Sequence, residues 1–80
     1  MQKQFPQRII SKSEDIWQAL LAGQHWSQIG GRKLQCRNDI VVFNLPSWYR
    51  LVCWIKEGLP SHSELMSHQR YNSFASNTRR

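Results

Sequence analysis

The chain has 80 residues and a net charge of +6, from eleven Lys and Arg against five Asp and Glu. This length allows one domain and excludes an enzyme with a separate cofactor domain. Apolar residues make up 40%, including four Trp, three Phe and two Tyr, which supports one modest core and excludes a wholly disordered chain. The basic excess favours nucleic acid, an acidic protein or an anionic surface as partner.

The sequence predicts a cytoplasmic protein with no membrane partner. The longest apolar run, Ile40 to Phe43, is far shorter than the roughly 18 residues that cross a bilayer. Residues 1–8 lack the apolar stretch of a secretory signal. Cys36 and Cys53 are too few for a disulfide framework, so we expect both as free thiols, with Cys53 in the core.

One helix is predicted in the first third of the chain. Ser11 and Glu14 have the spacing of a capping box, in which each side chain binds a free backbone N–H at a helix start. A stripe of apolar residues follows, and Gly23 suits the left-handed end of a helix. We therefore expect a helix over about 12–22, with residues 7–10 as a short strand or a first turn.

A small antiparallel sheet is predicted in the second half, from β-branched and aromatic runs bounded by turn residues. Its expected strands are a short edge strand at 32–34, a buried strand at 40–45, a strand from Trp48 or Tyr49 to Ile55, and a last strand at 63–67. The last two strands are joined by a loop at 57–61. Folding that hairpin about Leu59 places Arg50 opposite His68, with Cβ atoms about 5 Å apart.

The predicted fold class is α+β. An N-terminal helix packs on a small curved antiparallel sheet of three to four strands, and a short helix from Gln69 to Ala75 closes the chain. We expect a single domain over residues 1–80, with flexible ends at 1–9 and 76–80.

The sequence does not indicate a metal or nucleotide cofactor, and we expect none. Sixteen residues separate the two cysteines and five separate His62 from His68, and neither spacing matches a zinc site. The glycines before Arg32 and Lys33 lack the spacing and the Ser or Thr of a triphosphate-binding loop.

Three residues have the chemistry for cleaving RNA without a metal. Attack by a 2′-hydroxyl needs a proton acceptor, a proton donor and positive charge for the phosphorane, and His68, Tyr71 and Arg50 supply these groups. Further cations could hold phosphates: Arg32, Lys33, Arg37 and Arg70. Each residue also has an ordinary explanation, as a surface cation, a helix cap or a core aromatic.

Two segments resemble one toxin family. Residues 42–52, VFNLPSWYRLV, resemble the strand-turn-strand hairpin of HigB-type toxins in the RelE/ParE superfamily. Residues 67–72, SHQRYN, resemble the element that closes that domain. The resemblance implies an mRNA endoribonuclease that acts on the ribosome and is held inactive by a cognate antitoxin. It also implies that Arg50 lies near the scissile phosphate and that His68 and Tyr71 are acid–base or positioning residues.

The sequence departs from the family pattern in two ways, and other functions stay open. One convincing N-terminal helix replaces the usual pair, and Asn72 stands where aspartate is common. The ParE branch of the superfamily acts on DNA gyrase, so a non-nucleolytic gyrase inhibitor is one alternative. The other is a small non-catalytic nucleic-acid-binding protein in which Trp48, Tyr49 or Trp54 stacks on bases.

Overall fold

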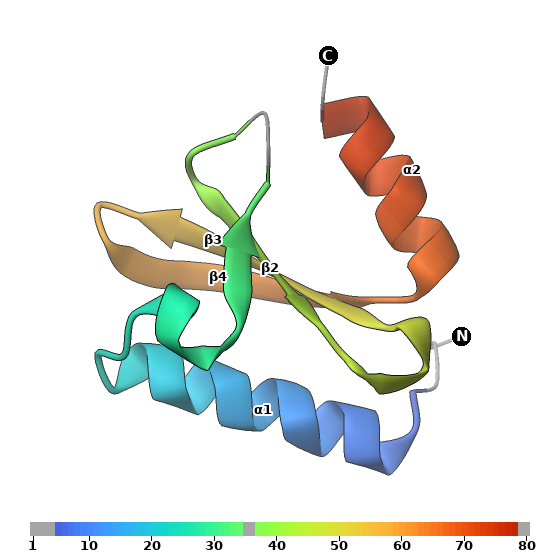
Figure 1. Cartoon of the computed structure of the whole chain (residues 1–80), viewed down its shortest axis with the longest axis horizontal. Helices are drawn as coiled ribbons and strands as arrows, with labels where there is room; N and C mark the ends of the chain where they lie inside the picture. Colours follow the sequence, from blue (N-terminus) through green and yellow to red (C-terminus); the bar gives the residue numbers. More distant parts are fainter. Residues whose placement is uncertain (1–4, 35–36, 79–80) are drawn as a thin grey trace.

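The structure is a computed structural model that describes residues 5–34 and 37–78. Its elements, in chain order, are α1 (Gln7–Leu21), the 3-10 turn η1 (Trp26–Ile29), β1 (Gly31–Lys33), β2 (Ile40–Asn44), the 3-10 turn η2 (Pro46–Trp48), β3 (Arg50–Lys56), β4 (Leu59–Met66) and α2 (His68–Thr78). All neighbouring strands are antiparallel, in the order β1-β2-β3-β4. Figure 1 shows α1 along one side of this sheet and α2 on the other. The predicted α+β class is confirmed.

The first helix begins five residues earlier than predicted. The carbonyl of Pro6 accepts the backbone N–H groups of Ile9 and Ile10 at 3.0 and 3.1 Å, and no side chain caps the helix. Proline fixes φ and has no N–H to satisfy, so it serves as a helix start without the predicted capping box. Ser11 lies inside α1, whereas Gly23 adopts φ +100° just after it, as predicted.

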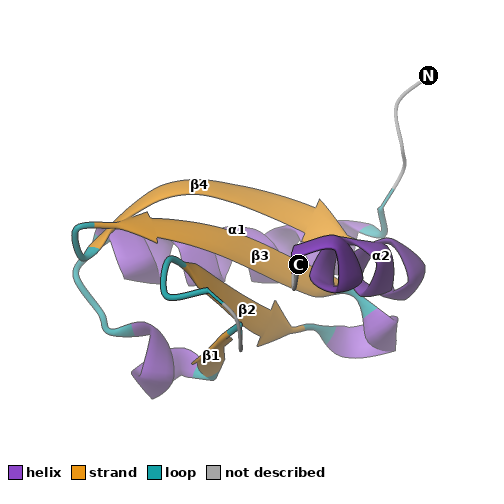
Figure 2. Cartoon of the chain, turned by 90° about the horizontal axis from the view of Figure 1, so that it is seen from above, coloured by secondary structure: helices purple, strands orange, loops and turns teal. Residues whose placement is uncertain are grey.

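The pairing of β3 with β4 differs from the prediction by two residues. Arg50 pairs with Met66, and the register shifts by one residue between Trp54 and Ile55. Glu57 and Gly58 both have positive φ and make a tight two-residue turn, so the expected loop over 57–61 is wrong. β4 therefore begins at Leu59, and it leads directly into α2 (Figure 2). His68 lies beyond the strand, as the first residue of α2.

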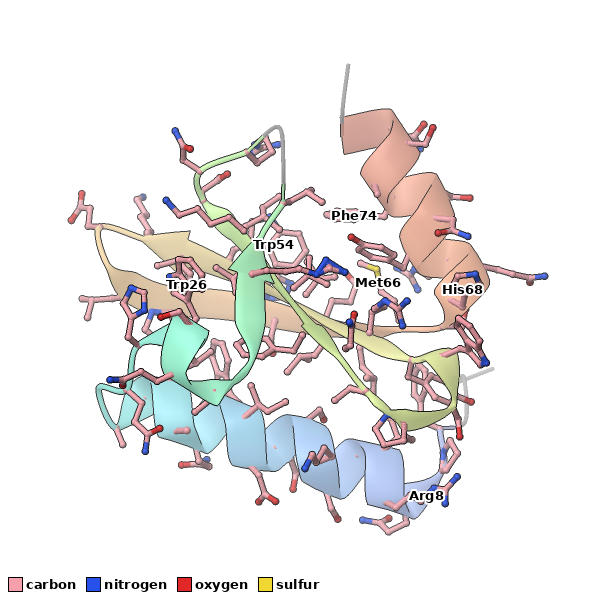
Figure 3. All side chains as sticks on the ribbon, viewed as in Figure 1. Arg8, Trp26, Trp54, Met66, His68 and Phe74 are labelled. Atoms are coloured by element: carbon pink, nitrogen blue, oxygen red, sulfur yellow. The ribbon has the colours of Figure 1, made fainter. Side chains whose placement is uncertain are left out.

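Both faces of the sheet carry a hydrophobic cluster. Toward α1, the buried side chains of Phe43, Leu51 and Cys53 pack with Ile9 and Leu20. The cluster on the α2 side consists of Ile40, Val42, Val52 and Met66, with Trp54, Tyr71 and Phe74 packed against it. Figure 3 shows Trp54, Met66 and Phe74 gathered between the sheet and α2. Along β3, successive residues therefore alternate between the two clusters.

A glycine allows β1 to lie close to the core. Gly31 pairs with Phe43, and a Cβ atom on Gly31 would lie 2.7 Å from the Phe43 ring and 2.9 Å from a methyl group of Val41. Gly30, at φ +93°, makes the turn from η1 into this strand. Gly30 therefore provides a left-handed turn, and Gly31 allows the close approach of β1 to the core.

No helix within residues 5–34 and 37–78 combines the length and the apolar character needed to span a bilayer.

Candidate functional site

Arg50 and Tyr71 lie in contact on the α2 side of the sheet. Arg50 is the first residue of β3, and its guanidinium carbon lies 5.6 Å from the centroid of the Tyr71 ring on α2. Its Nη1 donates a hydrogen bond to the Tyr49 carbonyl at 3.1 Å. A guanidinium held over an aromatic ring is attracted by the ring's negative face and keeps most of its N–H donors for other partners.

The other N–H donors of Arg50 determine what else this side chain can bind. Its Nε atom is buried and has no hydrogen-bond partner among the described residues. Buried donors are usually paired, and a guanidinium presents five N–H groups in a fixed fork that suits a phosphate. The side chain is therefore oriented in advance, and an anion would bind it through the Nη groups rather than through the buried Nε.

His68 lies near this pair, although not through the strand pairing that the sequence predicted. It precedes Tyr71 by three residues on α2, so both side chains lie on one side of the helix. The ring packs edge-to-face on Trp48 at a centroid distance of 5.3 Å. Within the described residues, no hydrogen bond joins His68 to Arg50. The predicted cross-strand contact is wrong because the shifted register puts Met66 in that place.

His68 has one polar neighbour on its own helix. The side-chain amide nitrogen of Asn72 lies 3.3 Å from its Nε2. The other ring nitrogen, Nδ1, is buried without a partner among the described residues. Asn72, which stands where the family resemblance places aspartate, is therefore the residue that contacts the imidazole from within α2.

Arg32 extends the positive charge across the sheet. In β1 it pairs with Val42, so its side chain lies on the same face as Arg50. Asn44 pairs with Arg50 across the β2–β3 ladder, and its Oδ1 accepts a hydrogen bond from Arg32 Nη2 at 3.3 Å. Arg32, Asn44 and Arg50 therefore form a row, and sequence reasoning did not identify its middle member.

The other predicted phosphate-holding residues lie elsewhere or are paired. Lys33 points to the α1 face, where its Nζ lies 5.9 Å from the Trp26 ring. Arg37 makes two hydrogen bonds to Asp39, at 3.0 and 2.8 Å, and these lower the pKa of that carboxyl. Arg70 makes an ion pair with Glu64. Of the four, Arg32 is the cation that the geometry groups with Arg50.

The η2 turn adds an exposed aromatic ring to this end of the sheet. Ser47 and Trp48 both have positive φ, at 60° and 69°, and the Tyr49 N–H donates to the Pro46 carbonyl across the turn. The Trp48 residue is 69% exposed. Sequence reasoning considered Trp48 only together with Tyr49 and Trp54, because a Pro-Ser-Trp turn does not reveal which ring faces solvent. Tyr49 and Trp54 are partly buried.

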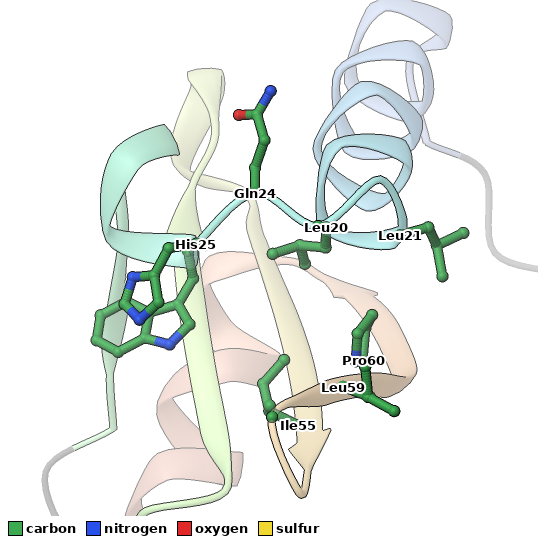
Figure 4. Close-up of a pocket in the computed structure, with 10 residues that line it drawn as sticks. Leu20, Leu21, Gln24, His25, Ile55, Leu59 and Pro60 are labelled. Carbon is green, nitrogen blue, oxygen red and sulfur yellow. The ribbon is translucent and has the colours of Figure 1, made fainter.

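A separate apolar pocket lies at the far end of β3. It has a volume of about 430 Å³ and is lined by the end of α1, the segment around His25 and the β3–β4 turn (Figure 4). Its β3 residue, Ile55, is five residues from Arg50, which is about 17 Å along a strand. The pocket is therefore not part of the Arg50 site.

The described residues show neither a metal centre nor a reactive thiol. They contain no group of three or more His, Cys, Asp or Glu side chains that could hold an ion. Burial raises the pKa of the Cys53 thiol to about 12, which keeps it protonated at neutral pH and confirms its assignment to the core. Cys36 lies outside the described residues.

Comparison with known proteins gave one finding. A family model described as the ParE-like toxin domain matches residues 7–73, from the first residue of α1 into α2. No significant match was found among curated proteins or among solved structures.

Proposed function

Because this chain belongs to the ParE-like toxin domain family, and so is a toxin of a toxin–antitoxin system, we propose that it is a metal-independent endoribonuclease that cleaves mRNA. A toxin domain implies a cognate antitoxin as a partner. The family places the chain in the RelE/ParE superfamily. The narrower HigB-like relationship, action on the ribosome and location in the cytoplasm belong to the proposal.

The contact between Arg50 and Tyr71, one helical turn from His68, carries this proposal. In the proposed reaction, Nε2 of His68 gives up its contact with the Asn72 amide and takes the proton of a ribose 2′-hydroxyl, whose oxygen then attacks the adjacent phosphorus. The bond from phosphorus to the 5′-oxygen breaks, and the Tyr71 hydroxyl donates a proton to that leaving oxygen. The products are a 2′,3′-cyclic phosphate and a 5′-hydroxyl end.

Arg50 stabilises the charge that develops on the non-bridging phosphate oxygens. Its guanidinium is already oriented by the Tyr71 ring and the Tyr49 carbonyl, so little reorganisation is needed when the phosphorane forms. Arg32, two strands away in the same row, is positioned to hold a neighbouring phosphate. Arg37 and Arg70 would contribute only by releasing Asp39 and Glu64, and Lys33 only from the α1 face.

A second function, inhibition of DNA gyrase without RNA cleavage, is favoured by the ParE-like description of the matching family. In this case, the row of Arg32, Asn44 and Arg50 would bind an acidic protein surface. His68 separates the two functions, since a nuclease needs an imidazole to move protons and a binding surface does not.

The two functions are tested by inducing the wild type, Arg50→Ala and His68→Ala in cells. Growth, mRNA 5′-ends and the supercoiling activity of extracts are followed together. We expect the wild type to stop growth with new mRNA ends, and both variants to be harmless although folded by circular dichroism. Arg37→Ala is the matched control, since it removes an exposed arginine outside the site and should stay toxic.

Wild-type toxicity with intact mRNA would overturn the nuclease proposal. If His68→Ala also keeps full toxicity while supercoiling activity falls, the toxin acts on gyrase.

A further inference from the structure

Trp48 is a large exposed side chain for which the fold has no evident need. Among residues 5–34 and 37–78, three large apolar residues are strongly exposed, namely Leu21, Leu59 and Trp48. Leu21 and Leu59 line the pocket at the far end of the sheet, whereas Trp48 lies beside His68 and two residues from Arg50. Two residues span at most about 7 Å, so Trp48 directly borders the candidate site.

The backbone of Trp48 is in a conformation that suits glycine. Its φ of 69° follows a φ of 60° at Ser47, and turns with two such central residues usually contain Asn, Asp or Gly. A bulky side chain at positive φ is strained, and strain of this kind persists where the surroundings hold it and often marks a functional site. The turn would form more easily with glycine at position 48.

Three contacts, two of them from the helices, hold the Trp48 ring and its turn in place. The His68 ring of α2 packs against the indole at 5.3 Å, with an angle of 61° between the two planes. Arg8 of α1 donates a hydrogen bond from Nη2 to the Ser47 hydroxyl at 3.0 Å. The backbone bond from Tyr49 to Pro46 closes the turn. The indole is thus both exposed and fixed in position.

We propose that Trp48 is a stacking platform for a nucleobase of single-stranded RNA, next to the phosphate held by Arg50. This inference rests on the proposed nuclease function. Stacking on an indole is sequence-tolerant, because every base has a π face, and it would hold the chain beside the reacting groups. The surroundings fit a polyanion, since Arg8 anchors the turn and Arg50 lies on the adjoining strand.

The test measures binding of a fluorescently labelled 2′-O-methyl RNA oligonucleotide, which cannot be cleaved because its attacking hydroxyl is blocked. The full chain is compared with Trp48→Gly, Trp48→Phe and Leu59→Ala. The last removes an equally exposed apolar side chain at the start of β4, at the other end of the sheet. We expect Trp48→Gly to weaken binding by about 5- to 150-fold, the range that corresponds to losing one stacked base. Trp48→Phe should retain most of the affinity, and Leu59→Ala all of it.

Thermal unfolding separates stacking from a structural role. Because glycine suits the backbone at position 48, Trp48→Gly should melt no lower than the wild type while it loses affinity. If Trp48→Gly melts lower, Trp48→Phe decides: a folded Phe variant with wild-type affinity supports stacking, and one as weak as the Gly variant overturns it.

Other outcomes separate this inference from the proposed function. Wild-type affinity and cleavage in Trp48→Gly would overturn the stacking role alone. No RNA binding by the wild type, with toxicity intact, would overturn the nuclease function as well. If Trp48→Gly binds RNA normally but no longer binds the co-expressed antitoxin, Trp48 is instead a protein contact.

Discussion

The guanidinium of Arg50 lies over the ring of Tyr71, 5.6 Å from its centroid, and this contact joins the sheet to α2. Phe74, one turn further along the helix, packs edge-to-face on Trp54 at 5.8 Å. The position of the proposed site therefore depends on how α2 docks on the sheet. Tyr71, one of the aromatic residues that cover the second face of the sheet, also orients the arginine.

The two parts of Tyr71 can be separated by substitution. Tyr71→Phe keeps the ring over Arg50 and removes only the proposed proton donor, so we expect normal folding and cleavage slower by about 100-fold or more. Tyr71→Ala should be slower still, because it also releases Arg50. Single-turnover cleavage of an mRNA fragment on purified ribosomes measures both effects. Cleavage by Tyr71→Phe at the wild-type rate would remove the hydroxyl from the mechanism.

The α1-side core can be tested by truncating two of its members. Phe43 and Leu51 are 1% and 3% exposed, so replacing them with Ala should cost about 3–5 and about 2–5 kcal/mol of unfolding free energy. Either loss is large for so small a domain. Urea denaturation provides the measurement, with the exposed Leu59→Ala as a control that should change stability by less than about 0.5 kcal/mol. Midpoints near that of the wild type would contradict the packing.

The close approach of β1 to the core predicts that Gly31→Ala is destabilising. The added methyl group would lie 2.7 Å from the Phe43 ring, so we expect a loss of about 1–3 kcal/mol in urea denaturation. In the double variant Gly31→Ala with Phe43→Leu, a smaller side chain replaces the opposing ring, and this should recover part of the lost stability. If the two effects simply add, the methyl group and the ring do not compete for space.

Cys53 predicts a stability change at high pH. Its pKa is about 12 in the folded protein, against 9.0 for an unperturbed thiol. Between these values the unfolded chain releases the thiol proton and the folded protein keeps it. The contribution of this thiol to the free energy of unfolding is therefore fully present below pH 9. Between pH 9 and pH 12 it falls by about 1.4 kcal/mol per pH unit.

The measurement for Cys53 is a difference between proteins, because Lys and Tyr residues also titrate in this range. Unfolding free energies of the wild type and Cys53→Ala are compared between pH 8 and pH 11. The gap between the two proteins should narrow as the pH rises, since the variant has no thiol at this position to titrate. A constant gap would show that the buried thiol does not resist ionisation.

The sequence predicted the sheet better than it predicted the ends of its elements. The β-branched and aromatic run from Ile40 to Phe43 identified a buried strand, since burial constrains every residue there. The start of α1 was missed because Pro6 replaces a side-chain cap with its own carbonyl. Pro60 falls within the loop expected at 57–61, but it lies in an edge strand, where a missing N–H is tolerated.

The sequence identified residues of the candidate site, but only part of their arrangement in space. Arg50, His68 and Tyr71 were identified by residue type and by the family resemblance, and the two-residue error in register left the face of Arg50 unchanged because side chains alternate every second residue. The contact of Arg50 with Tyr71 depends on how α2 docks, which no local pattern encodes. The pairing of Arg37 with Asp39 and of Arg70 with Glu64 likewise depends on side-chain geometry.

The helix that covers the second face of the sheet, α2, is translated after all four strands. Until residues 68–78 have left the exit tunnel, Ile40, Val42 and Val52 have no helix over them, and Arg50 has no aromatic ring beneath its charge. A nascent chain translated only as far as Met66 thus contains every strand but an unfinished site. The candidate site is therefore complete only after α2 has docked on the sheet.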